Sequence, residues 1–283
     1  MPRVLIAGCG YVGLATARLL SSAGWEVTGL THSSQSAQAL AKESFPVVCG
    51  DLGDETSLRA LRLTAMDAAV HCASSGRGGA EQYRRVYLDG VRNLLAVFPE
   101  VRLVFTSSTS VYAQIDGGVV TEESPARPDR ETGQLLRAAE DLALASGGVA
   151  ARLAGIYGPA RSVLLKKFFS GEAVIEGDGA RYVNQIHRDD AAAALALLVT
   201  TRASGIFNIA DSTPLPQREV YGWLAEHFQR PLPPSGPVDP NRKRGVTHKQ
   251  VSNARLRAQG WSPRYPSFRD AVLHDPELLV GFD

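Results

Sequence analysis

Short apolar runs alternate with longer amphipathic segments along the first half of the chain. The apolar runs, which are typical of buried strands, are Val4–Ala7, Glu26–Leu30, Val47–Cys49, Ala68–Cys72, Arg102–Thr106 and Val149–Ala154. Helical patterns lie between them at 11–23, 34–43, 55–62, 80–98 and 132–146. Strands that are almost continuously apolar belong to parallel sheets covered on both faces. The pattern therefore predicts an α/β fold with a doubly wound parallel sheet, a Rossmann fold.

The rhythm of the pattern changes after Gly158 and Pro159. The later elements are expected to be helices at 161–171, 189–202 and 217–229, a short strand at 173–176 and a strand at Ile206–Ile209. The helix at 189–202 and the strand after it are expected to return to the sheet. Residues 1–159, completed by 185–211, are thus predicted to form the Rossmann domain. Residues 160–184 and 212–283 are predicted to form a small substrate lobe.

The first apolar run passes into the sequence Gly8-Cys9-Gly10-Tyr11-Val12-Gly13, which opens the first helical pattern. In such a turn the first glycine permits a tight bend and the second lets a pyrophosphate approach the backbone. The third lets the helix pack closely on the strand, while the helix N-terminus faces the anion. We therefore interpret the segment as a dinucleotide-binding turn; the alternative is a glycine-rich turn without a ligand.

An acidic residue about twenty positions after such a turn usually binds the ribose 2′-hydroxyl of NAD. The chain there has Leu30-Thr31-His32-Ser33-Ser34, with no carboxylate to repel a 2′-phosphate. His32, Ser33 and the backbone amides are suited to bind such a phosphate, so NADP is favoured over NAD. A polar loop without this role is the alternative. Asp51 and Leu52 are expected near the adenine, although Asp51 could also simply cap the next helix.

Composition limits the classes of partner that the chain is expected to bind. The 283 residues include 30 Lys plus Arg against 29 Asp plus Glu, which argues against nucleic acid or an anionic membrane as the main partner. The cysteines, Cys9, Cys49 and Cys72, lie at or near the ends of apolar runs and have no metal-site spacing. We expect buried thiols, no metal and a cytoplasmic protein. The glycines between Val4 and Leu20 indicate a strand and a helix rather than a membrane span.

Further segments combine with the glycine turn into a family resemblance. They are Gly50-Asp51-Leu52, HCAS at 71–74, FTSSTSVY at 105–112, TEESP at 121–125, RLAGIYGP at 152–159, NQIHRDDAAAAL at 184–195 and GIFNIAD at 205–211. In this order they resemble the extended short-chain dehydrogenase/reductase superfamily, the NAD-dependent epimerase/dehydratase group. The resemblance implies a nicotinamide cofactor along the carboxyl ends of the strands, with contacts from Tyr11, Val12, Ala73, Ser74 and Thr106. It leaves open a homodimer formed through the helices at 80–98 and 132–146.

The resemblance also implies an acid–base group made of an Asn, a Ser or Thr, and a Tyr-x-x-x-Lys pair. Carried across, the Ser falls on Ser108, the Asn on Tyr87, the Tyr on Thr132 and the Lys on Leu136, so three of four positions depart from the pattern. Thr132 is further expected to be the N-cap of its helix. An aliphatic hydroxyl has a pKa nearer the ~15.7 of water than the ~10 of tyrosine. Thr132 can therefore form hydrogen bonds in the site but cannot replace the base.

Other side chains are candidates for the chemistry of the site. Ser108 can bond a substrate oxygen, and Tyr112 is expected at a strand end that faces the nicotinamide, with a turn anchor as its alternative. Tyr157 and His187 are weaker candidates, whose alternatives are packing and a hydrogen-bonded hinge. Glu122, with its neighbour Glu123, is expected in a solvated loop.

Two functions remain open from the sequence. The first is an NADP-dependent oxidoreductase or epimerase that acts on a small polar molecule, such as a nucleotide sugar, with non-standard acid–base groups. The second is a dinucleotide-binding sensor or scaffold without turnover, which the departures at Thr132 and Leu136 favour. Basic residues that follow the first six predicted strands could bind an anionic substrate, and the candidates are Arg161, Lys166, Lys167 and Arg181. The alternative for each is a position on the solvated surface of the small lobe.

Overall fold

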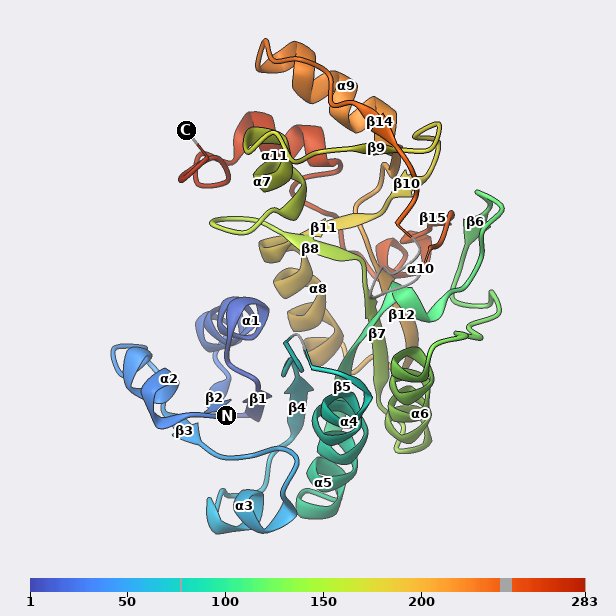
Figure 1. Cartoon of the computed structure of the whole chain (residues 1–283). Helices are drawn as coiled ribbons and strands as arrows, with labels where there is room; N and C mark the ends of the chain where they lie inside the picture. The colour runs from blue at the N-terminus through green and yellow to red at the C-terminus, as the bar shows by residue number, and fades with distance from the viewer. Residues whose placement is uncertain (77, 240–245, 283) are drawn as a thin grey trace.

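The computed structural model describes residues 1–76, 78–239 and 246–282, and a seven-stranded parallel sheet lies at its centre (Figure 1). The strand order is β12-β7-β5-β4-β1-β2-β3. In chain order the strands are β1 (Arg3–Ala7), β2 (Glu26–Thr31), β3 (Val47–Cys49), β4 (Ala68–His71), β5 (Arg102–Ser108), β7 (Val149–Leu153) and β12 (Gly205–Ile209). The order reverses direction between β1 and β4, which confirms the predicted doubly wound α/β sheet.

Helices cover both faces of this sheet (Figure 1). One face carries α1 (Tyr11–Ser22) and α8 (Arg188–Thr200), which pack against each other. The other face carries α3 (Glu55–Ala60), α5 (Gly90–Val97) and α6 (Glu131–Ala145), while α2 (Ser34–Ala39) lies beside the edge strand β3. Burial from both sides explains why the central strands are apolar over most of their length.

The helix predicted at 80–98 has three parts, α4 (Ala80–Tyr83), a π-helical segment η1 (Arg84–Asp89) and α5. A Cβ added at Gly90 would lie 3.1 Å from His71 Nε2, so this glycine lets the helix approach the end of β4. The same His71 nitrogen lies 2.8 Å from the carbonyl oxygen of Val86. Short π-helical turns occur often at functional sites, and this one borders the cavity described below.

Helix α6 begins earlier than its sequence suggests. Its first residue is Glu131 and its N-cap is Arg130, which makes no side-chain capping bond. The amides of Gly133 and Gln134 both donate to the Arg130 carbonyl, at 2.9 and 3.0 Å, and this sets the start of the helix. The prediction that Thr132 is the N-cap is therefore wrong, since Thr132 lies within the first turn.

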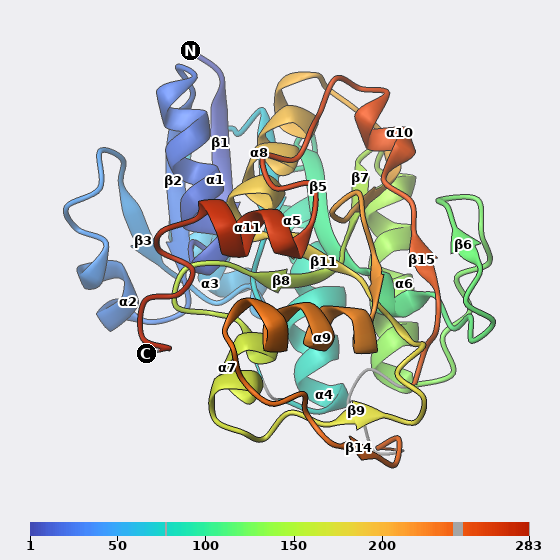
Figure 2. The ribbon, with the colours of Figure 1, turned by 90° about the horizontal axis from the view of Figure 1, so that it is seen from above.

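A second, smaller apolar cluster lies over the carboxyl ends of the strands (Figure 2). Its helices are α7 (Val163–Phe169), α9 (Gln217–His227) and α11 (Phe268–His274). The short strand pairs in this region are β9 (Ile175–Glu176) with β14 (Ser235–Gly236) and β10 (Tyr182–Val183) with β13 (Leu215–Pro216). The parallel pair of β8 (Gly155–Tyr157) and β11 (Gln185–His187) lies beneath them. Val251, Leu256 and Trp261 pack in the first cluster with the sheet, although they come late in the chain.

The three cysteines are all free thiols, but only two of them are buried or partly buried. Cys9 is buried, Cys72 is partly buried and Cys49 is exposed. The expectation of three buried thiols is wrong for Cys49, because it ends the edge strand β3. In the part of the chain that the structure describes, no helix is both long and apolar enough to cross a membrane.

A buried ion pair joins β7 to α6. Arg152 is 1% exposed, and its Nε and Nη2 donate to the carboxylate of the fully buried Glu140 at 2.7 to 3.2 Å. Ser107 on β5 donates to the same carboxylate at 2.5 Å. Arg152 Nη1 donates to the Tyr112 hydroxyl at 2.8 Å, and Tyr112 in turn meets Asn208 Oδ1 on β12 at 2.8 Å. Four elements of the sheet domain are thus fastened through one charged pair.

Breaking this pair is expected to cost much more than breaking a surface pair. Arg152→Ala should destabilise the protein by about 3–5 kcal/mol, because Glu140 would keep its charge in the core and lose its hydrogen bonds to Arg152, with Arg137 left as its charged partner. Thermal or urea unfolding measures the loss. Arg59→Ala is the control, since the Arg59–Glu55 pair is exposed and such pairs contribute about 1 kcal/mol or less. Equal losses in both variants would contradict a structural role for the buried pair.

Candidate functional site

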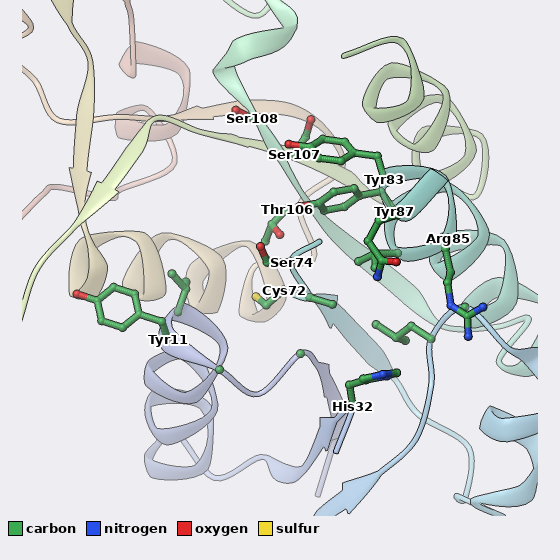
Figure 3. Close-up of a pocket in the computed structure, with 18 of the residues that line it drawn as sticks. Tyr11, His32, Cys72, Ser74, Tyr83, Arg85, Tyr87, Thr106, Ser107 and Ser108 are labelled. Carbon is green, nitrogen blue, oxygen red and sulfur yellow. The ribbon is translucent and has the colours of Figure 1, made fainter. Parts of the chain in front are cut away.

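A cavity of about 1000 Å³ opens at the carboxyl ends of the central strands (Figure 3). It lies beside the point where the strand order reverses, which is where open α/β sheets bind ligands. Its lining includes the glycine turn, the ends of β2, β4 and β5, and the helical segment α4–η1. Among the described residues, no three His, Cys, Asp or Glu side chains are grouped so that they could hold a metal ion.

The glycine turn has the geometry that close backbone packing requires. Gly8 has a φ of +100°, and a Cβ there would overlap the backbone of Ala73. A Cβ at Gly13 would overlap the carbonyl oxygen of Gly8, so Gly13 lies under the turn and not in the cavity lining. Gly10 has no neighbouring atom within 4 Å of a Cβ position and does line the cavity, as do Tyr11 and Val12. Bare amides beside open space fit a pyrophosphate at this turn.

The end of β2 forms one end of the cavity. Thr31 and His32 line it, whereas Ser33 does not, because its hydroxyl caps α2 by accepting from the Ser36 amide at 3.2 Å. Ser36 lines the cavity in its place. No carboxylate follows β2 directly, but Asp51 at the end of β3 has an oxygen 3.9 Å from His32 Nδ1.

Asp51 is held by Arg85, which no motif in the sequence marks as a site residue. The carboxylate accepts from the Arg85 guanidinium and from the Gly53 amide at 2.8 Å. Burial raises the pKa of Asp51, but these hydrogen bonds outweigh it and hold the pKa below its ordinary value. Asp51 and Leu52 line the cavity, while Asp54 and not Asp51 caps α3. Arg85 lies 34 residues from Asp51 in the chain, so no local pattern could have linked them.

The candidate catalytic residues divide between the cavity and the core. Ser108 lines the cavity at the end of β5, where its hydroxyl accepts from the Ser110 amide at 3.2 Å. Tyr112 is fully buried outside the lining, so the expectation that it faces a nicotinamide is wrong. The ion pair described above holds its hydroxyl, and burial raises its pKa. On α6, Leu136 lines the cavity but Thr132 does not.

Two tyrosines from the α4–η1 segment occupy the space beside Ser108. Tyr83 and Tyr87 both line the cavity, and Figure 3 shows their rings directed from the helix toward Thr106, Ser107 and Ser108. Their ring centroids are 5.0 Å apart, and the Ser75 amide donates to the Tyr87 hydroxyl at 3.3 Å. Tyr83 is not among the site residues predicted from the sequence. Its spacing of four residues from Tyr87 could have indicated it, because that spacing places both side chains on one side of a helix.

One arginine from the segment after β8 reaches the cavity. The Arg161 guanidinium lies over the Tyr11 ring at 5.1 Å, and the Tyr11 hydroxyl donates to the Pro159 carbonyl at 3.0 Å. Burial raises the pKa of Tyr11 to about 12, so its proton stays in place at neutral pH. The other basic candidates, Lys166, Lys167 and Arg181, are absent from the lining that the described residues form.

The remaining candidates serve the scaffold. His187 is fully buried, with Nε2 3.0 Å from Asp275 Oδ2 and Nδ1 accepting from the Asp189 amide at 3.3 Å, as the hinge alternative requires. Tyr157 is buried in the second apolar cluster. Glu122 is buried and accepts from the Asn208 amide at 2.8 Å, so its placement in a solvated loop is wrong. That bond lies inside the sheet domain, where burial raises the pKa of Glu122.

Comparisons with known proteins agree with this geometry. A model of the NAD dependent epimerase/dehydratase family matches residues 4–210. Protein YeeZ of Escherichia coli K12 is 32% identical over 237 residues, which cover 78% of this chain and 81% of YeeZ. UDP-glucose 4-epimerase of Corynebacterium glutamicum is 24% identical and matches 96% of this chain and 94% of its own. The structure of Thermus thermophilus UDP-glucose 4-epimerase with NAD superposes with a TM-score of 0.81 over 100% of this chain and 99% of the other, at 22% identity, which shows a shared fold.

The glycines of the turn predict separable effects on binding and stability. Gly10→Ala should leave the unfolding temperature almost unchanged but weaken binding of a nicotinamide dinucleotide at least ~10-fold, about 1.4 kcal/mol, because the methyl group enters the open space. Gly13→Ala should instead lower the unfolding temperature by several degrees through its overlap with Gly8. Calorimetric titration and thermal unfolding measure the two effects. Gly222→Ala, at an open helical position, is the control, and undiminished dinucleotide binding by Gly10→Ala would contradict the interpretation of the turn.

Proposed function

Since the chain belongs to the NAD dependent epimerase/dehydratase family, we propose that it is an NADP-dependent oxidoreductase or epimerase. Its substrate is a small polar molecule or a nucleotide sugar, and its acid–base groups are not those usual in the family. The observation that carries the proposal is the continuity of one cavity, from the open amides of the glycine turn to Ser108 and Arg161. Such a cavity accommodates a dinucleotide and a substrate end to end.

The preference for NADP rests on charge at the end of β2. A 2′-phosphate there meets the His32 ring and the Ser36 hydroxyl, with the Arg85 guanidinium close by at Asp51. The carboxylate of Asp51 opposes such a phosphate, but it is paired with the Arg85 guanidinium. An NAD-specific site usually carries an unpaired acid in this region instead.

The departure from the usual acid–base group also follows from the sequence. No tyrosine of the chain is followed four residues later by a lysine. Leu136, at the position where the family resemblance places that lysine, presents an aliphatic side chain to the cavity. It supplies no charge to hold a nicotinamide ribose or to lower the pKa of a phenol.

An anionic substrate is favoured by Arg161. Its guanidinium is held over Tyr11 and bounds the cavity on the side of the small lobe. Arginine suits phosphate because its planar fork of N–H donors matches two phosphate oxygens. A nucleotide sugar, which carries a diphosphate beside a polar ring, fits this charge and the volume of the cavity.

A non-catalytic dinucleotide-binding sensor or scaffold is the second candidate. Two observations support this candidate. Leu136 presents an aliphatic side chain to the cavity, and Thr132 does not line the cavity. Turnover with a panel of ketones and nucleotide sugars separates it from the enzyme. We further propose a cytoplasmic location, in keeping with the three free cysteines. A homodimer through the helical segments 80–98 and 132–146 stays a prediction.

The cofactor preference can be tested at His32. NADP at 100 times its dissociation constant should add roughly 2.7 kcal/mol to stability, a shift of several degrees, and NAD should require a higher concentration for the same shift. His32→Asp should weaken NADP at least ~10-fold, about 1.4 kcal/mol, and leave NAD binding equal or stronger, because a carboxylate repels the 2′-phosphate. His32→Gln is the matched uncharged control. Equal binding of NAD and NADP by the natural protein would refute the preference.

The substrate class can be tested at Arg161. Arg161→Gln should weaken binding of UDP-glucose to the NADP-loaded protein at least ~10-fold, about 1.4 kcal/mol, while NADP binding stays within about two-fold. Lys167→Gln, on the exposed side of α7, is the control. Isothermal titration with UDP-glucose and dTDP-glucose gives both constants. Loss of NADP binding without loss of sugar-nucleotide binding would show that Arg161 serves the cofactor and not the substrate.

A further inference from the structure

Reduction of a carbonyl group needs a proton donor beside the substrate oxygen, and α6 does not provide one. Helix α6 contributes Leu136 to the cavity lining, and the side chain of Leu136 carries no ionisable group. An aliphatic hydroxyl such as that of Ser108 has a pKa far above 7 and can orient an oxygen but cannot supply the proton efficiently. The donor must therefore come from another element that borders the same space.

Several titratable groups lie at the far end of the cavity, away from Ser108. His32 and Asp51 lie at the ends of β2 and β3, with Asp51 bound by Arg85. The hydroxyl of Tyr11 donates to Pro159. These groups border the turn and the end of β2 rather than the end of β5, where Ser108 lies.

Thiols and one carboxylate are also poor donors at this position. Burial raises the pKa of Cys72 to about 12 and that of Cys9 to about 11, so neither exchanges a proton readily near neutral pH. Glu81 is exposed to solvent in the first turn of α4 and is not enclosed beside Ser108. Tyr83 and Tyr87 are the phenols that remain beside β5.

Tyr83 is the better placed of these two phenols. It is 9% exposed, and Figure 3 shows its hydroxyl end directed toward Ser107 and Ser108. The Tyr87 hydroxyl accepts from the Ser75 amide at 3.3 Å, and its ring lies 5.0 Å from that of Tyr83 at 59°. Tyr87 thus supports the Tyr83 ring in one orientation. Helix α4 packs against α6, which brings Tyr83 and Leu136 to the same wall of the cavity.

We propose that Tyr83 is the proton donor of this site, a catalytic phenol supplied by α4 in place of the one that the family usually carries on α6. The inference rests on the proposed function and adds the direction of the reaction, which is reduction. A phenol has an ordinary pKa of about 10 and enters the reaction protonated at neutral pH. Because Leu136 offers no ammonium to make it a base, the site suits reduction of a ketone better than oxidation of an alcohol.

The proton balance of the step is simple. The O–H bond of Tyr83 breaks and a new O–H bond forms on the carbonyl oxygen of the substrate, which Ser108 orients. A reduced nicotinamide nucleotide, when bound, supplies the hydride that forms the new C–H bond. The tyrosinate then takes a proton from water, which restores the phenol for the next turnover.

A crystal structure with NADPH tests the placement without any need for turnover. In that complex we expect an open space near Ser108 that is large enough for a substrate oxygen atom. This atom would lie about 3 Å from both the Tyr83 hydroxyl and C4 of the nicotinamide. A Tyr83 hydroxyl with no such shared gap overturns the inference while the proposed function stands. Failure of NADPH to bind at all overturns the proposed function itself, so the two outcomes are distinct.

Substitution tests the role of the hydroxyl group. With NADPH and a 4-keto nucleotide sugar as the probe, Tyr83→Phe should lower kcat at least ~100-fold and change the Kd of NADPH less than about two-fold, since a general acid contributes about 10²–10⁴-fold. Tyr87→Phe should lower kcat far less, about ten-fold or less, because its phenol acts through the orientation of Tyr83. Tyr182→Phe, on β10 against His248, should match the natural protein. A large loss in Glu81→Gln with none in Tyr83→Phe would overturn the assignment.

Discussion

The close approach of α1 to β1 is the constraint on which the rest of the site depends. Gly8 turns with a positive φ against the backbone of Ala73, and Gly13 lies against the carbonyl of Gly8. Side chains at either position would push the helix off the strand and turn its free amides away from the cavity. Gly10 is different, since nothing surrounds it. Two glycines therefore position the helix, and the third leaves room for a ligand.

The other end of the cavity depends on charge buried in the core. The Arg152–Glu140 pair and the bond from Ser107 fix α6 against β5 and β7. Ser108, the next residue along β5, lines the cavity as a result. A buried pair of this kind costs desolvation energy and adds little net stability by itself, but loss of one partner leaves a charge that water cannot reach. Its contribution here is to hold α6, β5 and β7 in fixed positions beneath the site.

The chemistry of the site is distributed over elements that are distant in the chain. The glycine turn comes from the first strand and helix, the phenols from α4 and η1, Ser108 from β5 and Arg161 from the start of the small lobe. Parallel strands bring these segments together because their carboxyl ends share one edge of the sheet. Loss of the usual groups from one helix can then be met by a residue on its neighbour without any change of fold, and this is the physical basis for assigning a role to Tyr83.

Periodicity and glycine spacing were sufficient to predict the doubly wound sheet and the turn, because both depend on local rules of burial and backbone freedom. Asp51, Ser74, Thr106 and Ser108, which were predicted to contact the cofactor or the substrate, all line the cavity, and those contacts stay predictions. The sequence could not show which side of each element would face the cavity. Tyr112 and Glu122 turned inward because buried Arg152 and Asn208 offered them partners 40 and 86 residues away. Tyr83 and Arg85 entered the site because η1 and the close packing at Gly90 set the rotation of their helix, which only the packed tertiary structure decides.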